Sequence, residues 1–320
     1  MLKLGLIGCG TLGSVHVECM KAIGGAQFVA YADISQLAAE SYLHKFGGSY
    51  ATDDINKIIG DDQIDAVYIC TRHDSHASLA IAAANAGRHI FCEKPLALDL
   101  KSCEQIAETI DKTGVCMMPG FKMRYYPLVR EAKAFLENPQ VVVGQMMDYR
   151  WKDDYWAQDP IEGGGNVLSQ GCHTVDLLRY FAGSEPVAVW AAGGAMTHPG
   201  HQCLDQCVAS IQFANGCVGS WIQGDAGRPD FVSKMYFELF GHDKSVQLHD
   251  RLTRATLNDP NNTQHIHREE EEGFQLENEA FIAALNNGRK TEQTVFDGVQ
   301  ATRIVLAADA AIRTGKVQTF

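Results

Sequence analysis

The 320-residue chain lacks an apolar run long enough for a membrane-spanning helix, because no window approaches roughly 18 consecutive apolar residues. It also lacks an excess of basic residues: 27 Lys and Arg stand against 39 Asp and Glu, for a net charge of −12. Without a basic patch, we expect neither nucleic acid nor an anionic membrane as a partner. The N-terminal apolar stretch is too short for a signal peptide, so we expect a cytoplasmic protein.

Disulfide bonds are not expected either. The ten cysteines are scattered, and in a chain of this size without a secretion signal we interpret them as reduced, buried thiols. The length is sufficient for two domains with a sizeable core.

The N-terminal segment combines a strand, a glycine-rich turn and a helix. Residues 3–7 have the pattern of a strand, and a helical stretch follows the turn. The first motif glycine permits a tight turn, the second lets a pyrophosphate approach the backbone, and the third lets the helix pack closely on the strand. The predicted cofactor contacts in this turn are Gly8, Gly10, Thr11, Leu12 and Gly13.

Asp33 ends the next apolar run along the chain. A carboxylate at this distance from the glycine motif accepts hydrogen bonds from the adenosine ribose hydroxyls, and its charge repels a 2′-phosphate. The pattern therefore predicts NAD as the cofactor and makes NADP the less favoured one. The alternative is a glycine turn followed by a chance acid.

Strands and helices alternate as far as residue 118, which predicts a parallel, doubly wound Rossmann sheet. The strand at residues 65–70 ends in a polar loop, where Thr71 and His76 are candidate contacts for a cofactor or substrate. His76 is alternatively a simple residue at a helix N-terminus. We predict a dinucleotide-binding domain at residues 1–120 and a second domain at residues 121–320.

The strand at residues 89–92 stops at a Glu93-Lys94-Pro95 corner. Proline keeps the residue before it extended and donates no ladder hydrogen bond, so Lys94 should stand at the strand end. Ligands of an open parallel sheet bind beyond the carboxyl ends of its strands. Lys94, with Glu93 beside it, is therefore predicted where cofactor and substrate meet. The alternative is a solvated lysine.

The second half has a different pattern. Short runs of strand character follow one another from Glu185 onward, and Asn215-Gly216 is a hairpin signal, so we expect an α+β domain with a large open, mostly antiparallel sheet. Helices are predicted at residues 274–286 and 295–314, and the charged run at 267–272 is predicted to be a solvated loop.

One predicted helix, residues 166–182, carries Ser169, His173 and Asp176 on a single face. Short polar groups and a histidine on that face are typical of a helix that lines a polar cleft. The alternative is a buried histidine that is hydrogen-bonded to Asp176 for structural reasons.

The loop at residues 151–158 is dense in aromatic and polar side chains. The flat ring of Trp151 beside hydrogen-bonding groups suits a sugar, and packing between domains is the competing explanation. The histidines and cysteines between residues 198 and 207 match no zinc-binding spacing, so no metal is expected.

Five motifs occur in a fixed order: Gly8 to Gly13, Thr71 to His76, Gly87 to Leu96, Phe121 to Pro127, and Gly163 to Asp176. Through them the chain resembles, over nearly its whole length, the glucose–fructose oxidoreductase/inositol dehydrogenase (Gfo/Idh/MocA) family. The resemblance implies a Rossmann domain followed by an α/β domain whose open sheet often mediates dimers or tetramers. It also implies a nicotinamide cofactor and a sugar, polyol or sugar-derivative substrate.

By position, the resemblance implies that Lys94 lies near the nicotinamide and that His173 is catalytic. Many members carry an aspartate four residues before that histidine, whereas Ser169 stands here and takes up no proton at neutral pH. A mechanism that needs this aspartate as a third catalytic residue is therefore not expected here. The predicted substrate contacts are Lys94, Arg124, Trp151, Ser169, His173 and Asp176.

We therefore expect an NAD-dependent dehydrogenase that oxidises a secondary hydroxyl of a sugar, sugar derivative or cyclic polyol. His173 is the predicted general base and Lys94 the group that stabilises the developing alkoxide, and these roles are exchangeable. One alternative is non-redox glycoside cleavage with tightly bound NAD and a transient keto sugar. Another is a non-catalytic protein that senses NAD or a sugar. A homodimer or homotetramer through the C-terminal sheet is expected.

Overall fold

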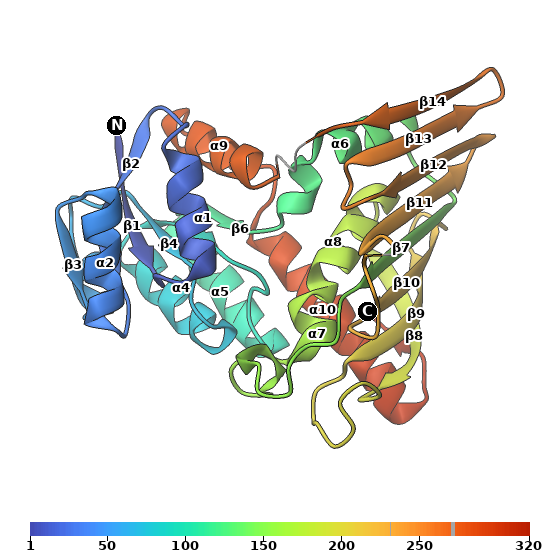
Figure 1. Ribbon diagram of the computed structural model, residues 1–320, viewed down its shortest axis with the longest axis horizontal. Helices are drawn as coiled ribbons and strands as arrows, with labels where there is room; N and C mark the ends of the chain where they lie inside the picture. Colours follow the sequence, from blue (N-terminus) through green and yellow to red (C-terminus); the bar gives the residue numbers. More distant parts are fainter. Residues whose placement is uncertain (231, 270–272) are drawn as a thin grey trace. The chain divides into compact units, whose positions relative to one another are not determined.

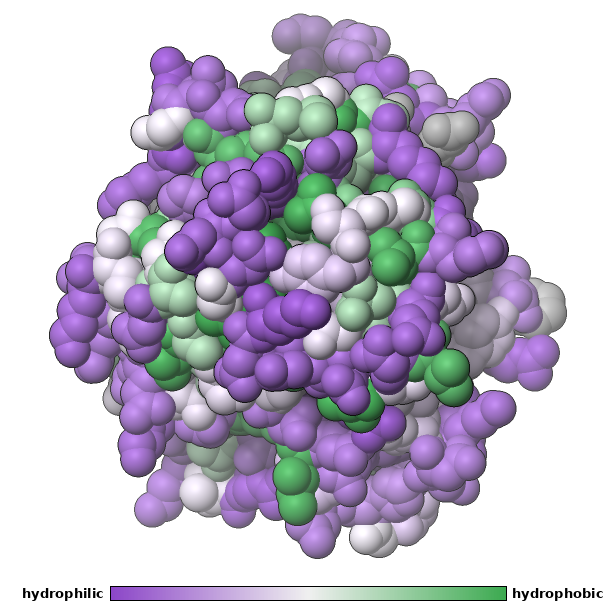
Figure 2. Space-filling view, turned by 90° about the vertical axis from the view of Figure 1, so that its left-hand side faces the viewer, coloured by the Kyte–Doolittle hydropathy of each residue, from purple (hydrophilic) through white to green (hydrophobic). Residues whose placement is uncertain are grey.

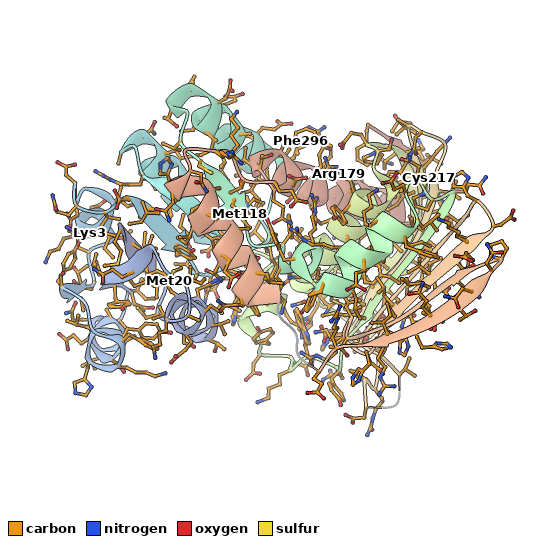
Figure 3. All side chains as sticks on the ribbon, turned by 90° about the horizontal axis from the view of Figure 1, so that it is seen from above. Lys3, Met20, Met118, Arg179, Cys217 and Phe296 are labelled. Atoms are coloured by element: carbon orange, nitrogen blue, oxygen red, sulfur yellow. The ribbon has the colours of Figure 1, made fainter. Side chains whose placement is uncertain are left out.

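The computed structural model describes residues 1–230, 232–269 and 273–320. They form two compact units: residues 1–122 with 274–299, and residues 123–273 with 300–320. Segment 274–299 packs with the first unit, although it follows the antiparallel strands in sequence and falls within the second domain as predicted, residues 121–320. Met118 and Phe296 thus belong to the first unit, whereas Arg179 and Cys217 belong to the second (Figure 3).

The first unit is built on a six-stranded sheet. Its strands are β1 (Leu2–Ile7), β2 (Ala26–Ala32), β3 (Tyr50–Thr52), β4 (Ala66–Ile69), β5 (His89–Cys92) and β6 (Met117–Pro119). They lie in the order β3-β2-β1-β4-β5-β6, and all neighbours are parallel, which confirms the predicted doubly wound sheet (Figure 1). The strand order reverses between β1 and β4, the point at which sheets of this kind bind ligands.

Helices connect these strands and bury their apolar faces on the sheet. The connecting helices are α1 (Thr11–Met20), α2 (Gln36–Phe46), α3 (Ile55–Ile59), α4 (His76–Asn85) and α5 (Leu100–Thr113), and α9 (Gly273–Asn286), which comes later in the chain, also belongs to this unit. Helix α5 shows how the sequence sets the ends: Asp99 accepts the Ser102 N–H over 2.8 Å, and Gly114 ends the helix in the left-handed region. Aliphatic side chains such as Ile69 and Ile90, both fully buried, fill the core.

The face shown in Figure 2 is largely hydrophilic, with apolar side chains in between. Two large apolar side chains near the start of α2, Ile34 and Leu37, are among those exposed on the first unit. Single exposed apolar residues of this kind are ordinary for a surface in contact with water.

The second unit is built on a nine-stranded sheet. Its strands are β7 (Val141–Met147), β8 (Pro186–Gly194), β9 (Gln206–Phe213), β10 (Val218–Gly224), β11 (Met235–Gly241), β12 (Lys244–His249), β13 (Arg254–Asp259), β14 (Asn262–His267) and β15 (Gln318–Thr319). They lie in the order β14-β13-β12-β11-β7-β10-β9-β8-β15, and among these neighbours only β7 and β10 are parallel. The predicted, mostly antiparallel sheet is confirmed.

One face of this sheet is covered and the other is open, because side chains alternate along each strand. On β9, Ala209 and Ile211 are buried while Val208 is exposed. The helices here are α6 (Pro127–Phe135), α7 (Gly165–Ser169), α8 (Gly171–Ala182) and the part of α10 (Val295–Thr314) that begins at Gln300, and α8 packs on β7 and β10. Within the described ranges, no helix has the length and apolar character needed to cross a membrane.

The predicted helix at residues 166–182 is two helices, interrupted at Gln170. Gly171 follows the interruption and lies against the buried indole of Trp221, since a Cβ there would come within 2.6 Å of the ring. The turn at Gln170 separates α7 from α8. As a result Ser169 closes α7, whereas His173 and Asp176 lie on α8.

Strand β14 has almost no sequence signal, because its residues, Asn-Thr-Gln-His-Ile-His, carry almost no apolar alternation. Its extended conformation comes from pairing with β13. Its last residue, His267, is the first of the charged run predicted as a loop, and residues 270–272 of that run lie outside the described residues. All ten cysteines are free thiols, of which seven are buried, whereas Cys9, Cys19 and Cys116 are half-buried.

Candidate active site

The glycine-rich turn joins β1 to α1, and its three glycines meet different steric demands. Gly8 has φ of +100°, and a Cβ on it would lie 2.5 Å from Cys70 O. A Cβ on Gly13 would lie 2.4 Å from Gly8 O and would force α1 away from the turn. A Cβ on Gly10 would have no neighbour within 4 Å among the described residues. The backbone of Gly10 is therefore open to a ligand, as a pyrophosphate requires.

The start of α1 offers backbone N–H groups to the same place. Thr11 and Leu12 form its first turn, and no side chain from the described ranges caps it. Uncapped N–H groups and the positive end of the helix dipole favour an anion.

Asp33 follows β2, and the glycine turn fixes its carboxylate. Cys9 N donates to Asp33 Oδ2 over 2.8 Å, and Ser35 N donates to Oδ1 over 2.9 Å. Each oxygen keeps a further lone pair for a ribose hydroxyl, and the residue is only half-buried. The turn, the helix start and Asp33 together fit a dinucleotide.

Thr71 and His76 lie beyond the carboxyl end of β4. Thr71 Oγ1 is 2.6 Å from Ser75 Oγ. His76 is fully buried: its Nδ1 donates to Pro95 O over 2.8 Å, and its Nε2 lies 3.2 Å from Thr71 O. Burial lowers the pKa of His76, so the ring is neutral. A neutral ring carries one N–H, so it donates to only one of these two carbonyl oxygens at a time, and a cofactor contact by the protonated nitrogen would have to break that bond.

Lys94 stands at the carboxyl end of β5, before a cis peptide bond to Pro95, and is only 9% exposed. Its backbone N–H donates to Glu93 Oε2 over 3.2 Å. His16 on α1 donates Nε2–H to Glu93 Oε1 over 3.0 Å, and Asn278 on α9 donates to His16 Nδ1 over 2.9 Å. Burial raises the pKa of Glu93, but the His16 hydrogen bond and the Lys94 charge outweigh it and lower that pKa. Glu93 is therefore a buried carboxylate beside Lys94.

A second acid, Glu277 on α9, lies close to His16 and Glu93. Glu277 is fully buried, and neither oxygen of its carboxyl has a hydrogen-bond partner among the residues that the structure describes. Burial, and next the charge of Glu93, raise the pKa of Glu277 well above its ordinary value. Burial therefore favours the protonated, neutral form of Glu277 in the folded chain.

Replacing Glu277 with glutamine is expected to stabilise the protein at pH 8 by about 1 kcal/mol or more. The folded chain keeps the proton that the unfolded chain releases above its ordinary pKa, so wild-type stability falls as the pH rises through that range. Glutamine removes this loss, and the gain should shrink toward pH 4. Denaturant unfolding at both pH values measures it, with Glu279→Gln, an exposed acid on the same helix, as the control. An equal gain in the free energy of unfolding at both pH values would contradict the assignment of a raised pKa to Glu277.

In the second unit, Ser169, His173 and Asp176 are all buried. Asp176 binds Arg124 in a two-bond ion pair: Arg124 Nε donates to Oδ2 over 2.8 Å, and Nη2 donates to Oδ1. Two predicted substrate contacts, Arg124 and Asp176, thus balance each other's charge. Of the two predicted catalytic residues, Lys94 belongs to the first unit and His173 to the second.

Trp151 lies in the aromatic loop after β7. Its backbone N–H donates to Asp225 Oδ2 over 3.0 Å, and its ring contacts the Tyr155 ring edge-on, with the centroids 5.1 Å apart. The loop is therefore anchored at its first residue.

Sequence reasoning missed the partners of Glu93. The spacing of His16, three residues after Gly13 and beside the buried Val17, was the available signal. Three sets of potential cation ligands are present among the described residues: Asp153, His198 and His201; His198, Asp205 and Asp225; and His16, Glu93 and Glu277. In the second set, both ring nitrogens and all four carboxylate oxygens already take part in hydrogen bonds within the protein.

Two family models match this chain. Residues 2–121 match the model described as "Oxidoreductase family, NAD-binding Rossmann fold", and residues 134–247 match "GFO/IDH/MocA C-terminal domain". An inositol 2-dehydrogenase from Rhizobium meliloti (strain 1021) is 27% identical, over 98% of this chain and 96% of its own. A myo-inositol 2-dehydrogenase from Thermotoga maritima is 28% identical, over 75% of this chain and 73% of its own.

Solved structures share the fold. A levoglucosan dehydrogenase in complex with NADH and levoglucosan superposes with a TM-score of 0.91 at 24% sequence identity, over 99% of each chain. At this identity the likeness concerns the fold alone.

Proposed function

The chain belongs to the GFO/IDH/MocA family of oxidoreductases, and from that premise we propose that it is an NAD-dependent dehydrogenase acting on a secondary hydroxyl of a sugar, sugar derivative or cyclic polyol. The proposal rests mainly on the groups found at one edge of the first sheet. There the open backbone at Gly10, the anchored Asp33 and the buried Lys94 all follow strands of one parallel sheet. The inositol dehydrogenases among its relatives support the substrate class.

The residues of the glycine turn and Asp33 would hold the cofactor, which supplies an acceptor for the hydride that leaves the alcohol carbon. Asp33 would accept the adenosine ribose hydroxyls. Lys94 would donate a hydrogen bond to the substrate oxygen as negative charge develops there. Its burial strengthens that bond, because water competes poorly in a site of low dielectric.

His173 is the proposed general base, and a ring nitrogen would take the hydroxyl proton. Asp176 lies one helical turn after it, and we propose that this carboxylate, held by Arg124, orients the imidazole. Ser169 would hydrogen-bond a further substrate hydroxyl as donor or acceptor without adding charge. Trp151 would offer its ring face to the apolar side of the sugar.

Asp33→Asn is expected to weaken NAD binding about tenfold and to narrow the preference for NAD over NADP, because the amide keeps the shape but loses the charge. Titration of each cofactor into the purified protein measures both affinities. Asp53→Asn, an exposed acid in the loop after β3, should leave them unchanged. An unchanged NAD to NADP ratio in Asp33→Asn would refute the assignment of Asp33 to the ribose.

The activity itself is tested by following formation of reduced nicotinamide with NAD or NADP and a panel of sugars, inositols and sugar acids. Turnover of one member, faster with NAD, supports the dehydrogenase. A flat trace, with NAD recovered from the denatured protein, would favour non-redox glycoside cleavage instead.

We further propose that a second copy covers the open face of the large sheet, giving a homodimer or homotetramer. A hollow of about 470 Å³ lies on this sheet and is lined by residues that include Trp190 and Val218, which are each 47% exposed. Large apolar side chains on an otherwise open sheet favour such an association.

A further inference from the structure

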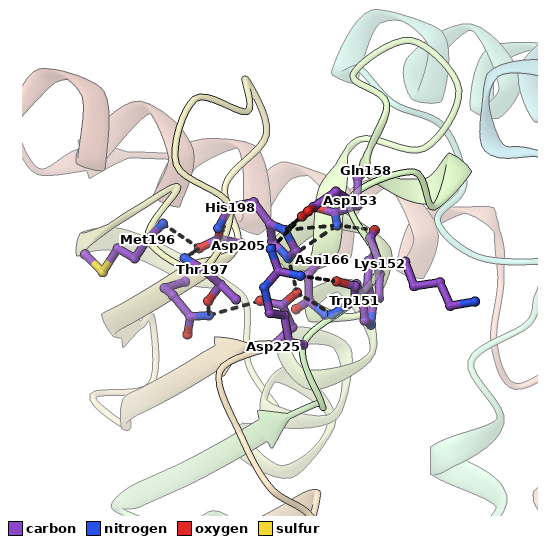
Figure 4. A network of polar contacts seen from close by, with 12 residues as sticks. Trp151, Lys152, Asp153, Gln158, Asn166, Met196, Thr197, His198, Asp205 and Asp225 are labelled. Atoms are coloured by element: carbon purple, nitrogen blue, oxygen red, sulfur yellow. Dashed lines mark hydrogen bonds and ion pairs between the residues drawn. The ribbon is translucent and has the colours of Figure 1, made fainter.

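Three segments of the second unit meet at the side chain of His198 (Figure 4). They are the aromatic loop at residues 151–158, the loop at residues 196–205 that carries His198, and Asp225, which directly follows β10. The ring is fully buried. The loop at 151–158 and Asp225 follow β7 and β10, the two parallel strands at the middle of the sheet.

Both ring nitrogens of His198 face carboxylates. Nδ1 lies 2.8 Å from Asp153 Oδ1, and Nε2 lies 2.7 Å from Asp225 Oδ2. A carboxylate only accepts, so both bonds form only when both nitrogens carry a proton. Burial lowers the pKa of His198, but the hydrogen bonds to Asp225 and Asp153 outweigh it and raise that pKa above the ordinary value. The geometry is thus that of an imidazolium between two carboxylates.

The buried partner is fixed in turn. Asp225 Oδ2 also accepts a hydrogen bond from the backbone N–H of Trp151 over 3.0 Å, and Asp225 Oδ1 accepts one from Gln206 Nε2 over 3.2 Å. The His198 loop is closed by Asp205, which accepts the backbone N–H groups of residues 196, 197 and 198. His198 and Asp225 together therefore hold the aromatic loop at two points, Trp151 and Asp153.

We propose that protonated His198 is a positioning residue that fixes the 151–158 loop, and with it Trp151, in the conformation that binds substrate. The loop is positioned by the hydrogen bonds of His198 and Asp225 to Asp153 and Trp151, all within the second unit. The consequence for substrate binding rests on the proposed sugar or polyol dehydrogenase.

The arrangement implies a pH dependence. The groups near the His198 ring are Asp225, Asp153, Asp205, the Arg150 guanidinium, the Gln158 amide and the His201 ring at 5.3 Å. Since the folded pKa of His198 is raised, its stabilising contribution is complete at acidic pH and is lost as the pH rises through that pKa. A neutral ring has one N–H, so one carboxylate loses its donor. The exposed Asp153 is the partner expected to separate.

Hydrogen–deuterium exchange of the 151–158 amides, corrected for the intrinsic pH dependence of exchange, tests the positioning without any substrate. In the wild type, protection of this loop should fall between neutral and alkaline pH. In His198→Gln it should be low at both pH values, because glutamine carries no charge. Asp153→Asn should behave like His198→Gln. The matched controls are His201→Gln and Asp154→Asn, which alter a neighbouring ring and a neighbouring exposed acid, and they should keep the wild-type profile.

Steady-state kinetics test the consequence. His198→Gln should raise the substrate KM about tenfold at neutral pH, with kcat and NAD affinity little changed, and the wild-type KM should rise toward that value at alkaline pH. Protection of the 151–158 loop at the wild-type level in His198→Gln would overturn the proposal, and so would an equal loss of protection in His201→Gln or a wild-type loop whose protection does not change with pH. If the loop loses protection as expected but no sugar or polyol is turned over, the positioning stands and the proposed function fails.

Discussion

Lys94→Met is expected to lower kcat for alcohol oxidation roughly 10²–10³-fold while NAD still binds. Methionine keeps the unbranched stem of the lysine but removes the donor that we place at the developing alkoxide. Lys94 stands at the end of β5, is 9% exposed and follows the buried carboxylate of Glu93, so most of its side chain is shielded from water. A donor in such a place stabilises charge far more than one in water.

Single-turnover kinetics and NAD titration separate chemistry from binding in this variant. Lys101→Met, an exposed lysine on α5, is the control and should match the wild type. Lys94→Arg keeps the charge but changes the donor geometry, so we expect partial activity. Turnover within a few-fold of the wild type in Lys94→Met would remove Lys94 from the reaction.

His173→Gln is expected to lower kcat roughly 10²–10⁴-fold, the range for loss of a general base. It should also flatten the acid limb of the pH–rate profile, because that limb reports protonation of the base. The residue is buried on α8, so a folding control by thermal unfolding belongs with the kinetics. His44→Gln, an exposed histidine of α2, should leave the profile unchanged.

The two variants together also test which residue takes the proton. If His173→Gln keeps the acid limb and Lys94→Met loses it, the roles are exchanged and Lys94 is the base. If both keep it and both retain turnover, neither residue takes the proton and the proposed site is wrong.

The sequence by itself determined the parts that depend on local backbone geometry. The glycine turn is one, because only residues without a Cβ fit where one would lie 2.5 Å from Cys70 O or 2.4 Å from Gly8 O. The sequence also determined the parallel and the antiparallel sheet, because the apolar pattern of short segments indicates which of their side chains are buried. The Glu93-Lys94-Pro95 corner at the end of β5 belongs here too, since proline acts on the residue before it.

Tertiary structure alone decided how distant polar groups pair. His16 and Asn278 are 262 positions apart, and no periodicity links α1 to α9 or brings Glu277 beside Glu93. The pairing of Arg124 with Asp176, the interruption of the helix at Gln170 and the contacts of His198 likewise arise where separate segments pack together. A buried charge or N–H group must find a partner wherever the fold supplies one. The identity of that partner therefore follows from the packing of the whole unit and is absent from any local pattern.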